Sequence, residues 1–243
     1  MSTTLVSAFV SNVNEKYADT LTRYYKYGQL LLKSRIPKII FLDEPMMNLI
    51  GNNYNKSTTL VVKTQKSDSY FYTYKDTLSN FHVNSTDHTK DTVEFMFTMC
   101  NKTEWVKEAI LLNYFKTENF IWVDFGIRHV FSGTDEAFIE NINSLNSKMY
   151  SGVRIGAIWN LNNRFNLDIY KDIAWYFAGG VFGGNANALV KFSDLMKNKC
   201  IDIMTNKNTI MWEVNIWYLI YTENQAIFDV YYCNHDNRII TNY

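Results

Sequence analysis

The sequence predicts an α/β fold built on a Rossmann-type, mostly parallel central sheet. Residues 120–127 begin with four apolar side chains and continue into the single carboxylate of Asp124. An apolar run of this length is typical of a strand covered on both faces, as strands of parallel sheets are. Further apolar runs alternate along the chain with stretches of helical period. Hydrophobic residues make up 47% of the composition, enough for a full core.

The N-terminal part predicts strands that alternate with a helix. Strands are expected at residues 5–10, 37–43 and 59–64, where apolar side chains are consecutive. Pro37 stands at the first position of the second strand, where its missing N–H matters least. Between the first two strands, apolar and aromatic side chains recur at helical spacing over residues 15–33, which predicts a helix.

The middle of the chain is less regular. Residues 65–90 are polar and have little hydrophobic period, which predicts an excursion from the core, either a lid or a short helical insertion. Residues 92–99 alternate between apolar and polar side chains, which fits a strand or the lead-in to a helix. Asn101 and Glu104 have the spacing of a capping box, so a helix is expected between them and the strand at residue 120.

The C-terminal part continues the alternation. A helix is expected over residues 138–149, strands over 153–159 and 174–177, and a polar loop over 160–172. No internal repeat, charge block or linker divides the sequence, so residues 1–243 are predicted to form one domain.

Composition excludes several classes of protein. The formal net charge is +0, so no global field would draw the chain to nucleic acid or to an anionic membrane. The N-terminus lacks the pattern of a signal peptide, and no apolar stretch is long enough to span a bilayer, so a cytoplasmic location is expected, or the host cytoplasm or virion if the source is viral. The three cysteines are far apart in sequence, which predicts reduced, buried thiols instead of a disulfide framework or a zinc site: Cys100, Cys200 and Cys233.

Asp124 is the first candidate site residue. In parallel sheets, ligands bind just outside the carboxyl ends of the strands, and Asp124 follows its strand directly. A buried carboxylate without a partner costs free energy, so Asp124 needs a metal, a donor group or water. The alternative is that it caps the following turn, and this stretch alone does not decide between the two.

A glycine cluster at residues 178–185 is the second candidate feature. It holds Gly179, Gly180, Gly183 and Gly184, which implies tight backbone geometry or the close approach of a ligand. A helical pattern follows, so a helix N-terminus would point towards such a ligand. The alternative is a tight turn between sheet and helix, and we favour the ligand site.

Two further residues are weaker candidates. Glu213 stands alone among apolar side chains, which predicts a paired or functional carboxylate, although an exposed helix start capped by Asn208 or Thr209 is favoured on this stretch alone. His235 follows a late strand and could bind a metal or a phosphate, although a lone histidine is more often an ordinary surface residue.

Together these stretches resemble the HtrL/YibB family of glycosyltransferase-like proteins. More distantly, the pattern is similar to retaining GT-A glycosyltransferases of the blood-group type, which carry an Asp-x-Asp after an apolar strand. The resemblance spans nearly the whole chain in the right order, and its points are Val6-Ser7-Ala8-Phe9, Trp105-Val106-Lys107-Glu108-Ala109, residues 120–127 with His129, residues 179–185, Trp212-Glu213-Val214-Asn215 and His235-Asp236.

The resemblance implies a GT-A-like fold that transfers a sugar, hexosyl or N-acetylhexosaminyl, from a nucleotide donor to a glycan or other hydroxyl acceptor, with retention. A UDP-sugar is the expected donor. Asp124 would lie at the donor pyrophosphate and Glu213 near the anomeric carbon, as the two catalytic residues. The donor-binding residues that the resemblance implies are Ala8, Phe9, Val10, Lys107, Trp122, Val123, Phe125, Gly126 and Arg128. Those along the donor sugar and acceptor are His129, Gly179, Gly180, Phe182, Gly183, Gly184, Trp212 and Asn215.

The sequence departs from this pattern at Gly126, which replaces the second acid of Asp-x-Asp. An octahedral Mn²⁺ or Mg²⁺ usually takes carboxylate ligands, so metal binding would rest on Asp124 and His235, or be absent. Transfer without a metal needs other cations for the departing diphosphate, and Lys107 and Arg128 are the candidates by position.

Two alternatives to a transferase remain open at this stage. The lost second acid also fits a catalytically inactive protein that binds a nucleotide sugar or a glycan. Zero net charge and an aromatic content of 16% also fit a non-catalytic structural or assembly protein. The sequence does not predict the oligomeric state.

Overall fold

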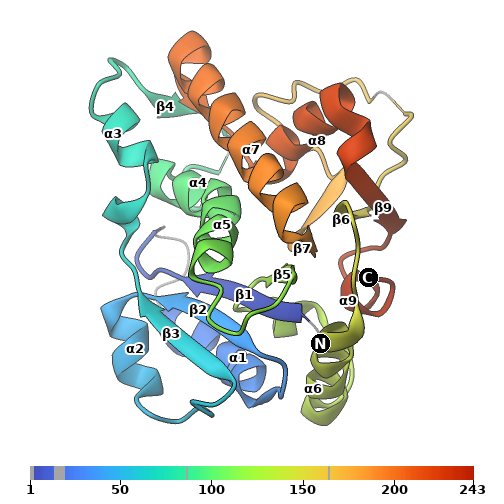
Figure 1. Ribbon diagram of the computed structural model, residues 1–243. Helices are drawn as coiled ribbons and strands as arrows, with labels where there is room; N and C mark the ends of the chain where they lie inside the picture. Colours follow the sequence, from blue (N-terminus) through green and yellow to red (C-terminus); the bar gives the residue numbers. More distant parts are fainter. Residues whose placement is uncertain (1–2, 14–19, 86, 164) are drawn as a thin grey trace.

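The computed structural model describes residues 3–13, 20–85, 87–163 and 165–243. Within this part of the chain, seven strands form one mixed sheet in the order β3-β2-β1-β5-β7-β6-β9, and β4 and β8 form a small second sheet (Figure 1). The strands are β1 (Thr3–Phe9), β2 (Lys38–Leu42), β3 (Thr59–Lys63), β4 (His82–Val83), β5 (Asn119–Val123), β6 (Val153–Ala157), β7 (Phe177–Asn185), β8 (Thr209–Ile210) and β9 (Phe228–Tyr232).

Helices cover both faces of the large sheet. The α-helices are α1 (Thr20–Lys33), α2 (Glu44–Ile50), α3 (Phe71–Lys75), α4 (Val93–Cys100), α5 (Lys102–Leu112), α6 (Asp135–Ser144), α7 (Ala186–Lys207), α8 (Glu213–Asn224) and α9 (Arg238–Thr241). Short 3₁₀ helices are η1 (Lys66–Asp68), η2 (Ile127–Val130), η3 (Leu145–Ser147) and η4 (Gln225–Ile227).

The sheet is parallel on one side and mixed on the other. Strands β3, β2, β1 and β5 run parallel, β7 is antiparallel to both β5 and β6, and β9 is parallel to β6. The predicted α/β class with a mostly parallel sheet is therefore confirmed. The central strand β5 has a parallel neighbour on one edge only.

Alternation along the strands divides the core into two layers. On β5, Trp122 joins the layer that contains α4, α5, α7 and α8, whereas Ile121 and Val123 join the layer that contains α1, α2, α6 and α9. The same division applies to β1, where Val6 faces the first layer and Leu5 the second. This arrangement explains the continuous apolar runs, because both faces of each strand are buried.

The predicted strands at residues 5–10, 37–43, 59–64 and 153–159 correspond to β1, β2, β3 and β6. The predicted helix at 15–33 is present as α1, and the part of that prediction over residues 14–19 lies outside the described residues.

The structure decides between the alternatives left open for two segments and corrects the expectation for a third. Residues 92–99 form helix α4, because Thr92 accepts a hydrogen bond from the backbone N–H of Phe95 and caps it. The glycine cluster is part of the long strand β7 and not a turn between sheet and helix. The capping box is not formed, since the side chain of Asn101 makes no cap hydrogen bond and Glu104 accepts from Ser193 Oγ at 2.6 Å.

The polar segment 65–90 forms η1, α3 and β4, which makes it a partly helical insertion. Strand β4 pairs in parallel with β8, so the insertion is joined to the chain just before α8. As expected, the three cysteines are free and buried. No helix in the described ranges is long and apolar enough to cross a membrane.

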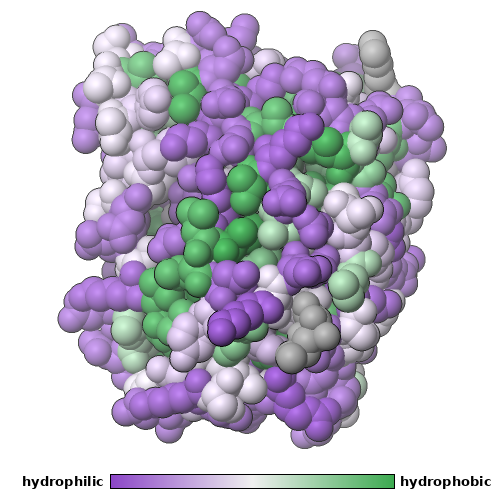
Figure 2. Space-filling view, viewed as in Figure 1, coloured by the Kyte–Doolittle hydropathy of each residue, from purple (hydrophilic) through white to green (hydrophobic). Residues whose placement is uncertain are grey.

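Hydrophobic residues also reach the surface. Figure 2 shows them in a band across the middle of one face, surrounded by hydrophilic residues. The large apolar side chains that are exposed at the end of α5 and just beyond it are Leu111, Leu112 and Tyr114.

Candidate active site

A cleft of about 370 Å³ opens at the carboxyl ends of β1 and β5. These neighbouring strands mark a topological switch point, because the chain passes from β1 to β2 and β3 on one side while β5 lies on the other. Open α/β sheets bind their ligands at such a point. The cleft is lined by the ends of both strands together with residues of α4, α5, β7 and α8.

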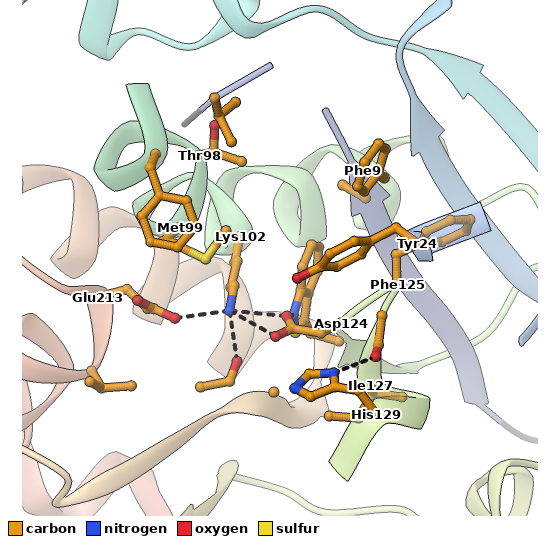
Figure 3. Close-up of a pocket in the computed structure, with 18 of the residues that line it drawn as sticks. Phe9, Tyr24, Thr98, Met99, Lys102, Asp124, Phe125, Ile127, His129 and Glu213 are labelled. Carbon is orange, nitrogen blue, oxygen red and sulfur yellow. Dashed lines mark hydrogen bonds and ion pairs between the residues drawn. The ribbon is translucent and has the colours of Figure 1, made fainter. Parts of the chain in front are cut away.

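The side chain of Lys102 links three of the residues that line this cleft (Figure 3). Its Nζ lies 3.0 Å from Asp124 Oδ1, 2.9 Å from Glu213 Oε1 and 3.0 Å from the carbonyl oxygen of Gly179. Lys102 is 2% exposed and Glu213 is 3% exposed. One buried ammonium therefore holds two carboxylates that come from different parts of the chain.

Lys102 occupies this place because of how α4 and α5 meet. Helix α4 ends at Cys100, and α5 begins at Lys102 after the single residue Asn101, whose backbone is also helical. Burial lowers the pKa of Lys102, but the charges of Asp124 and Glu213 outweigh that effect, so the pKa is raised. The amine stays protonated and cannot act as a general base.

Asp124 is the first residue after β5, as the sequence predicted. Its backbone N–H donates to the carbonyl of Gly180 at 2.9 Å, which fixes the end of β5 to β7. Its Oδ1 also accepts a hydrogen bond from Trp122 Nε1 at 2.7 Å. The side chain is 32% exposed and faces the cleft, so Asp124 is both tied to the protein and open to a ligand.

Glu213 is the first residue of α8 and is buried, so the alternative of an exposed helix start is wrong. Trp212, not Asn208 or Thr209, is the N-cap residue. Glu213 Oε1 accepts from Lys102, whereas Oε2 is buried and has no hydrogen-bond partner in the described part of the chain. Because an unpaired buried oxygen is costly, Oε2 is suited to accept a hydrogen bond from a ligand.

The glycines of β7 fall into two groups. Gly179 and Gly180 line the cleft, and a Cβ added to Gly179 would lie 2.5 Å from Glu213 Oε1. Gly183 and Gly184 pack against neighbouring backbone, since added Cβ atoms would lie 2.6 Å from the Phe120 carbonyl oxygen and 2.1 Å from that of Gly152. Gly179 makes room for Glu213, Gly180 for Ile127, and Gly183 and Gly184 for neighbouring backbone.

Two histidines, His129 and His235, also line the cleft. The ring of His129 lies with Nδ1 2.6 Å from the Gly126 carbonyl oxygen, so Nδ1 carries a proton and Nε2 remains for another partner. The ring of His235 packs edge-on against Trp175, with centroids 4.5 Å apart. Burial, and then the charge of His129, lower the pKa of His235.

Aromatic rings form two walls of the cleft. On the β1 side, Phe9 lies 5.2 Å from Tyr24 and 5.8 Å from Phe125, centroid to centroid. On the α8 side, Trp212 packs edge-on against Phe95 at 5.2 Å. The ammonium of Lys90 lies 4.3 Å from the centroid of the Trp212 ring. Flat apolar surfaces of this kind suit the faces of bases and sugars.

The structure brings most of the predicted site residues to one place. Those that line the cleft are Ala8, Phe9, Val10, Trp122, Asp124, Phe125, Gly126, His129, Gly179, Gly180, Trp212, Glu213 and His235.

Seven predicted site residues lie outside the cleft. Val123 and Phe182 are core residues, and Gly183 and Gly184 pack against the backbone of Phe120 and Gly152. The Asn215 side chain donates to the carbonyls of Ile169 and Asp172 and so holds the loop before β7.

The two cations proposed from sequence for the diphosphate also lie elsewhere. Lys107 is paired with Asp194 at 2.6 Å on the outer side of α5. Arg128 is paired with Asp135 at 2.9 Å and donates to the carbonyls of Phe131 and Gly133. Neither Lys107 nor Arg128 lines the cleft, so we no longer propose them as partners of the diphosphate.

Sequence reasoning missed Lys102, Lys90, Tyr24 and Trp175, which also line the cleft. The one local signal for Lys102 is its position between the apolar stretch that ends at Cys100 and the apolar Trp105 and Val106, where a lysine needs a partner. Nothing local identifies that partner.

The chain matches, over residues 2–238, the family model described as "Bacterial protein of unknown function (HtrL_YibB)". The chain belongs to the HtrL/YibB family. Among solved structures, this family member is similar to the apo form of mouse xyloside xylosyltransferase 1, with 10% sequence identity, a TM-score of 0.49, and coverage of 95% of this chain and 85% of that one. At this identity and TM-score the likeness says nothing about activity. No curated protein matches the sequence.

Proposed function

We propose that this HtrL/YibB family member is a glycosyltransferase, which moves a sugar from a nucleotide-diphosphate sugar to a hydroxyl of a glycan or another acceptor. The observation that carries the proposal is Glu213, a buried carboxylate with one unpartnered oxygen, held by Lys102 in an aromatic cleft at the switch point of the sheet. The resemblance of the sequence to retaining GT-A enzymes supports the same assignment.

The charges of the cleft suit the chemistry of glycosyl transfer. Lys102, Asp124 and Glu213 together carry a formal charge of one negative unit. The reacting glycosyl centre becomes oxocarbenium-like, and a negative group beneath it stabilises that positive charge. We propose that Glu213 provides this group and that the sugar is transferred with retention, which NMR of the product anomer would test.

The departing diphosphate needs positive charge elsewhere. Lys90 is the proposed cationic partner, and His129 and His235 are proposed hydrogen-bond donors to the diphosphate, because all three residues line the cleft. The Phe9, Tyr24 and Phe125 wall is the proposed place of the nucleobase. UDP is the expected nucleotide.

A second candidate is a protein that binds a nucleotide sugar without turning it over. It is favoured by the ion pairs of Lys102, which already neutralise part of the charge on both carboxylates. It predicts donor binding without product, whereas a purely structural protein would bind no nucleotide.

The first experiment is thermal unfolding of the full chain with UDP-, GDP-, CMP- and dTDP-sugars. A ligand present at about 100 times its Kd adds about 2.7 kcal/mol to the free energy of unfolding. We expect a higher Tm with one nucleotide, and product formation with a glycan acceptor. Absence of a shift with every donor would contradict the proposal, and a shift without product under varied acceptors would favour the second candidate.

A further inference from the structure

Lys102 sits where three oxygen atoms converge. Carboxylate oxygens of Asp124 and Glu213 and the carbonyl oxygen of Gly179 surround its Nζ at 2.9–3.0 Å. Carboxylate and carbonyl oxygens are the ligands that hard divalent cations take in proteins. The ammonium therefore occupies a place that has the donor set of a cation site.

The remaining surroundings do not fit a divalent ion at Asp124. Trp122 Nε1 donates to Asp124 Oδ1, and Lys102 Nζ lies 3.0 Å from Oδ1 and 3.3 Å from Oδ2, so both carboxylate oxygens already have a donor of the protein beside them. In the described part of the chain, no group of three or more His, Cys, Asp and Glu side chains is placed to hold a metal ion. A metal at Asp124 would also be repelled by the neighbouring buried ammonium.

The packing around residue 126 favours glycine over the second acid of the Asp-x-Asp pattern. Gly126 stands where the Asp-x-Asp pattern has its second carboxylate, and a Cβ added there would lie 2.4 Å from Tyr24 Cε1. The ring of Tyr24 in turn packs against Phe9. A carboxylate side chain at this position has no room unless Tyr24 moves, so this cleft is shaped around a glycine.

We infer that Lys102 takes the place of the divalent metal in this cleft, so that donor binding and sugar transfer need no metal held by Asp124. What the inference says about transfer rests on the proposed function, whereas the occupation of the cation site by Lys102 does not. Lys102 is a positioning residue, because it is enclosed and acts through Asp124 and Glu213.

The inference makes a prediction about an engineered cavity. Removing the ammonium with Lys102→Ala leaves two carboxylates and a carbonyl around an empty space, which is a site for a cation. We expect the wild-type chain to bind no Mn²⁺ at this site and the Lys102→Ala variant to bind one Mn²⁺.

The measurement is Mn²⁺ binding by electron paramagnetic resonance, with and without UDP, on the full chain. Lys107→Ala is the matched control, since Lys107 lies on the same helix and pairs with Asp194 outside the cleft. The double variant Lys102→Ala, Asp124→Asn should lose the gained Mn²⁺. A folded Lys102→Ala variant without any gain overturns the inference.

If Lys102→Ala does not fold, Mn²⁺ binding and donor binding by the wild-type protein test the inference. One Mn²⁺ bound to wild type and lost in Asp124→Asn overturns the inference, and donor binding that persists in chelator supports it. If donors bind only with Mn²⁺, and that Mn²⁺ needs Asp124, the inference fails while the proposed function stands. If no donor binds but Lys102→Ala gains Mn²⁺, the proposed function fails while the occupied cation site stands.

Discussion

The Nζ of Lys102 lies 2.9 Å from Glu213 Oε1, although the two residues are 111 positions apart in the sequence. Both side chains are almost fully buried. An ion pair in such a place contributes little relative to an apolar pair, but removing one partner leaves a buried charge that nothing compensates. The pair is thus a point where single substitutions have large effects.

Replacing Lys102 by Met should destabilise the fold strongly, because two carboxylates then share a buried space. Loss of one partner of a buried pair costs about 3–5 kcal/mol. Urea unfolding at neutral pH measures the loss. The control is Lys107→Met, whose partly exposed pair with Asp194 should cost about 0–1 kcal/mol. Equal effects of the two variants would contradict the role of burial.

Replacing Glu213 by Gln should abolish sugar transfer while the donor still binds. The amide keeps the shape of the side chain but loses the negative charge that is proposed to stabilise the oxocarbenium-like centre. Initial rates and donor-dependent Tm shifts measure the two properties separately. Full turnover in this variant would remove Glu213 from the mechanism.

Replacing Gly179 by Ala should impair the site more than the fold. The added Cβ would lie 2.5 Å from Glu213 Oε1, and the end of a flexible side chain can move away. At Gly183 the obstacle is the backbone oxygen of Phe120, so Gly183→Ala should unfold at a clearly lower temperature. We expect at least tenfold slower transfer for Gly179→Ala with a smaller loss of Tm. The opposite order would contradict this division of the glycines.

Replacing Lys90 by Met should weaken donor binding by about tenfold, or roughly 1.4 kcal/mol. Lys90 lies over the Trp212 ring at the wall of the cleft and is a proposed partner of the diphosphate. The difference from wild type should shrink as salt is added, since salt screens exposed charges. A Lys63→Met variant serves as the comparison, because Lys63 does not line the cleft and forms a surface pair with Glu44. Unchanged donor affinity in Lys90→Met would place the diphosphate elsewhere.

The buried Lys38 should make stability depend on pH. Burial lowers its pKa from 10.5 to about 8, so the folded chain loses this proton at a lower pH than the unfolded chain. Between those pH values the unfolded state binds more protons, and the contribution of Lys38 to the free energy of unfolding rises with pH. The rise is roughly 3 kcal/mol over the window.

Urea unfolding of wild type and Lys38→Met from pH 7 to 10 isolates this effect, because other titrating groups are shared. The stability of wild type minus that of the variant should increase with pH. A constant difference would show that Lys38 titrates alike in both states.

The position of Asp124 could be predicted from sequence because its signal is local. Four consecutive apolar residues define a strand, and the next residue stands at its end whatever the distant chain does. The same applies to Phe9 and Val10 at the end of β1. For such residues, knowing which strand they follow is sufficient to place them at the edge of the sheet where the cleft lies.

Lys102 could not be predicted in the same way, because its partners lie 22, 77 and 111 positions away. The long strand β7 was missed for a similar reason. Glycine weakens a strand, and only the close approach of Phe120 on β5 and of Gly152 just before β6 explains why Gly183 and Gly184 are needed there. Segment 92–99 was ambiguous because its alternation of side chains fits two periods, and the capping hydrogen bond of Thr92 decides for the helix.

The pairing of β4 with β8 has a mechanical consequence for the insertion at residues 65–90. Strand β8 ends at Ile210, three residues before Glu213, and Val83 is its partner. The insertion is therefore hydrogen-bonded to the segment that leads into the helix that carries Glu213. A displacement of the insertion would therefore move β8, which ends three residues before Glu213.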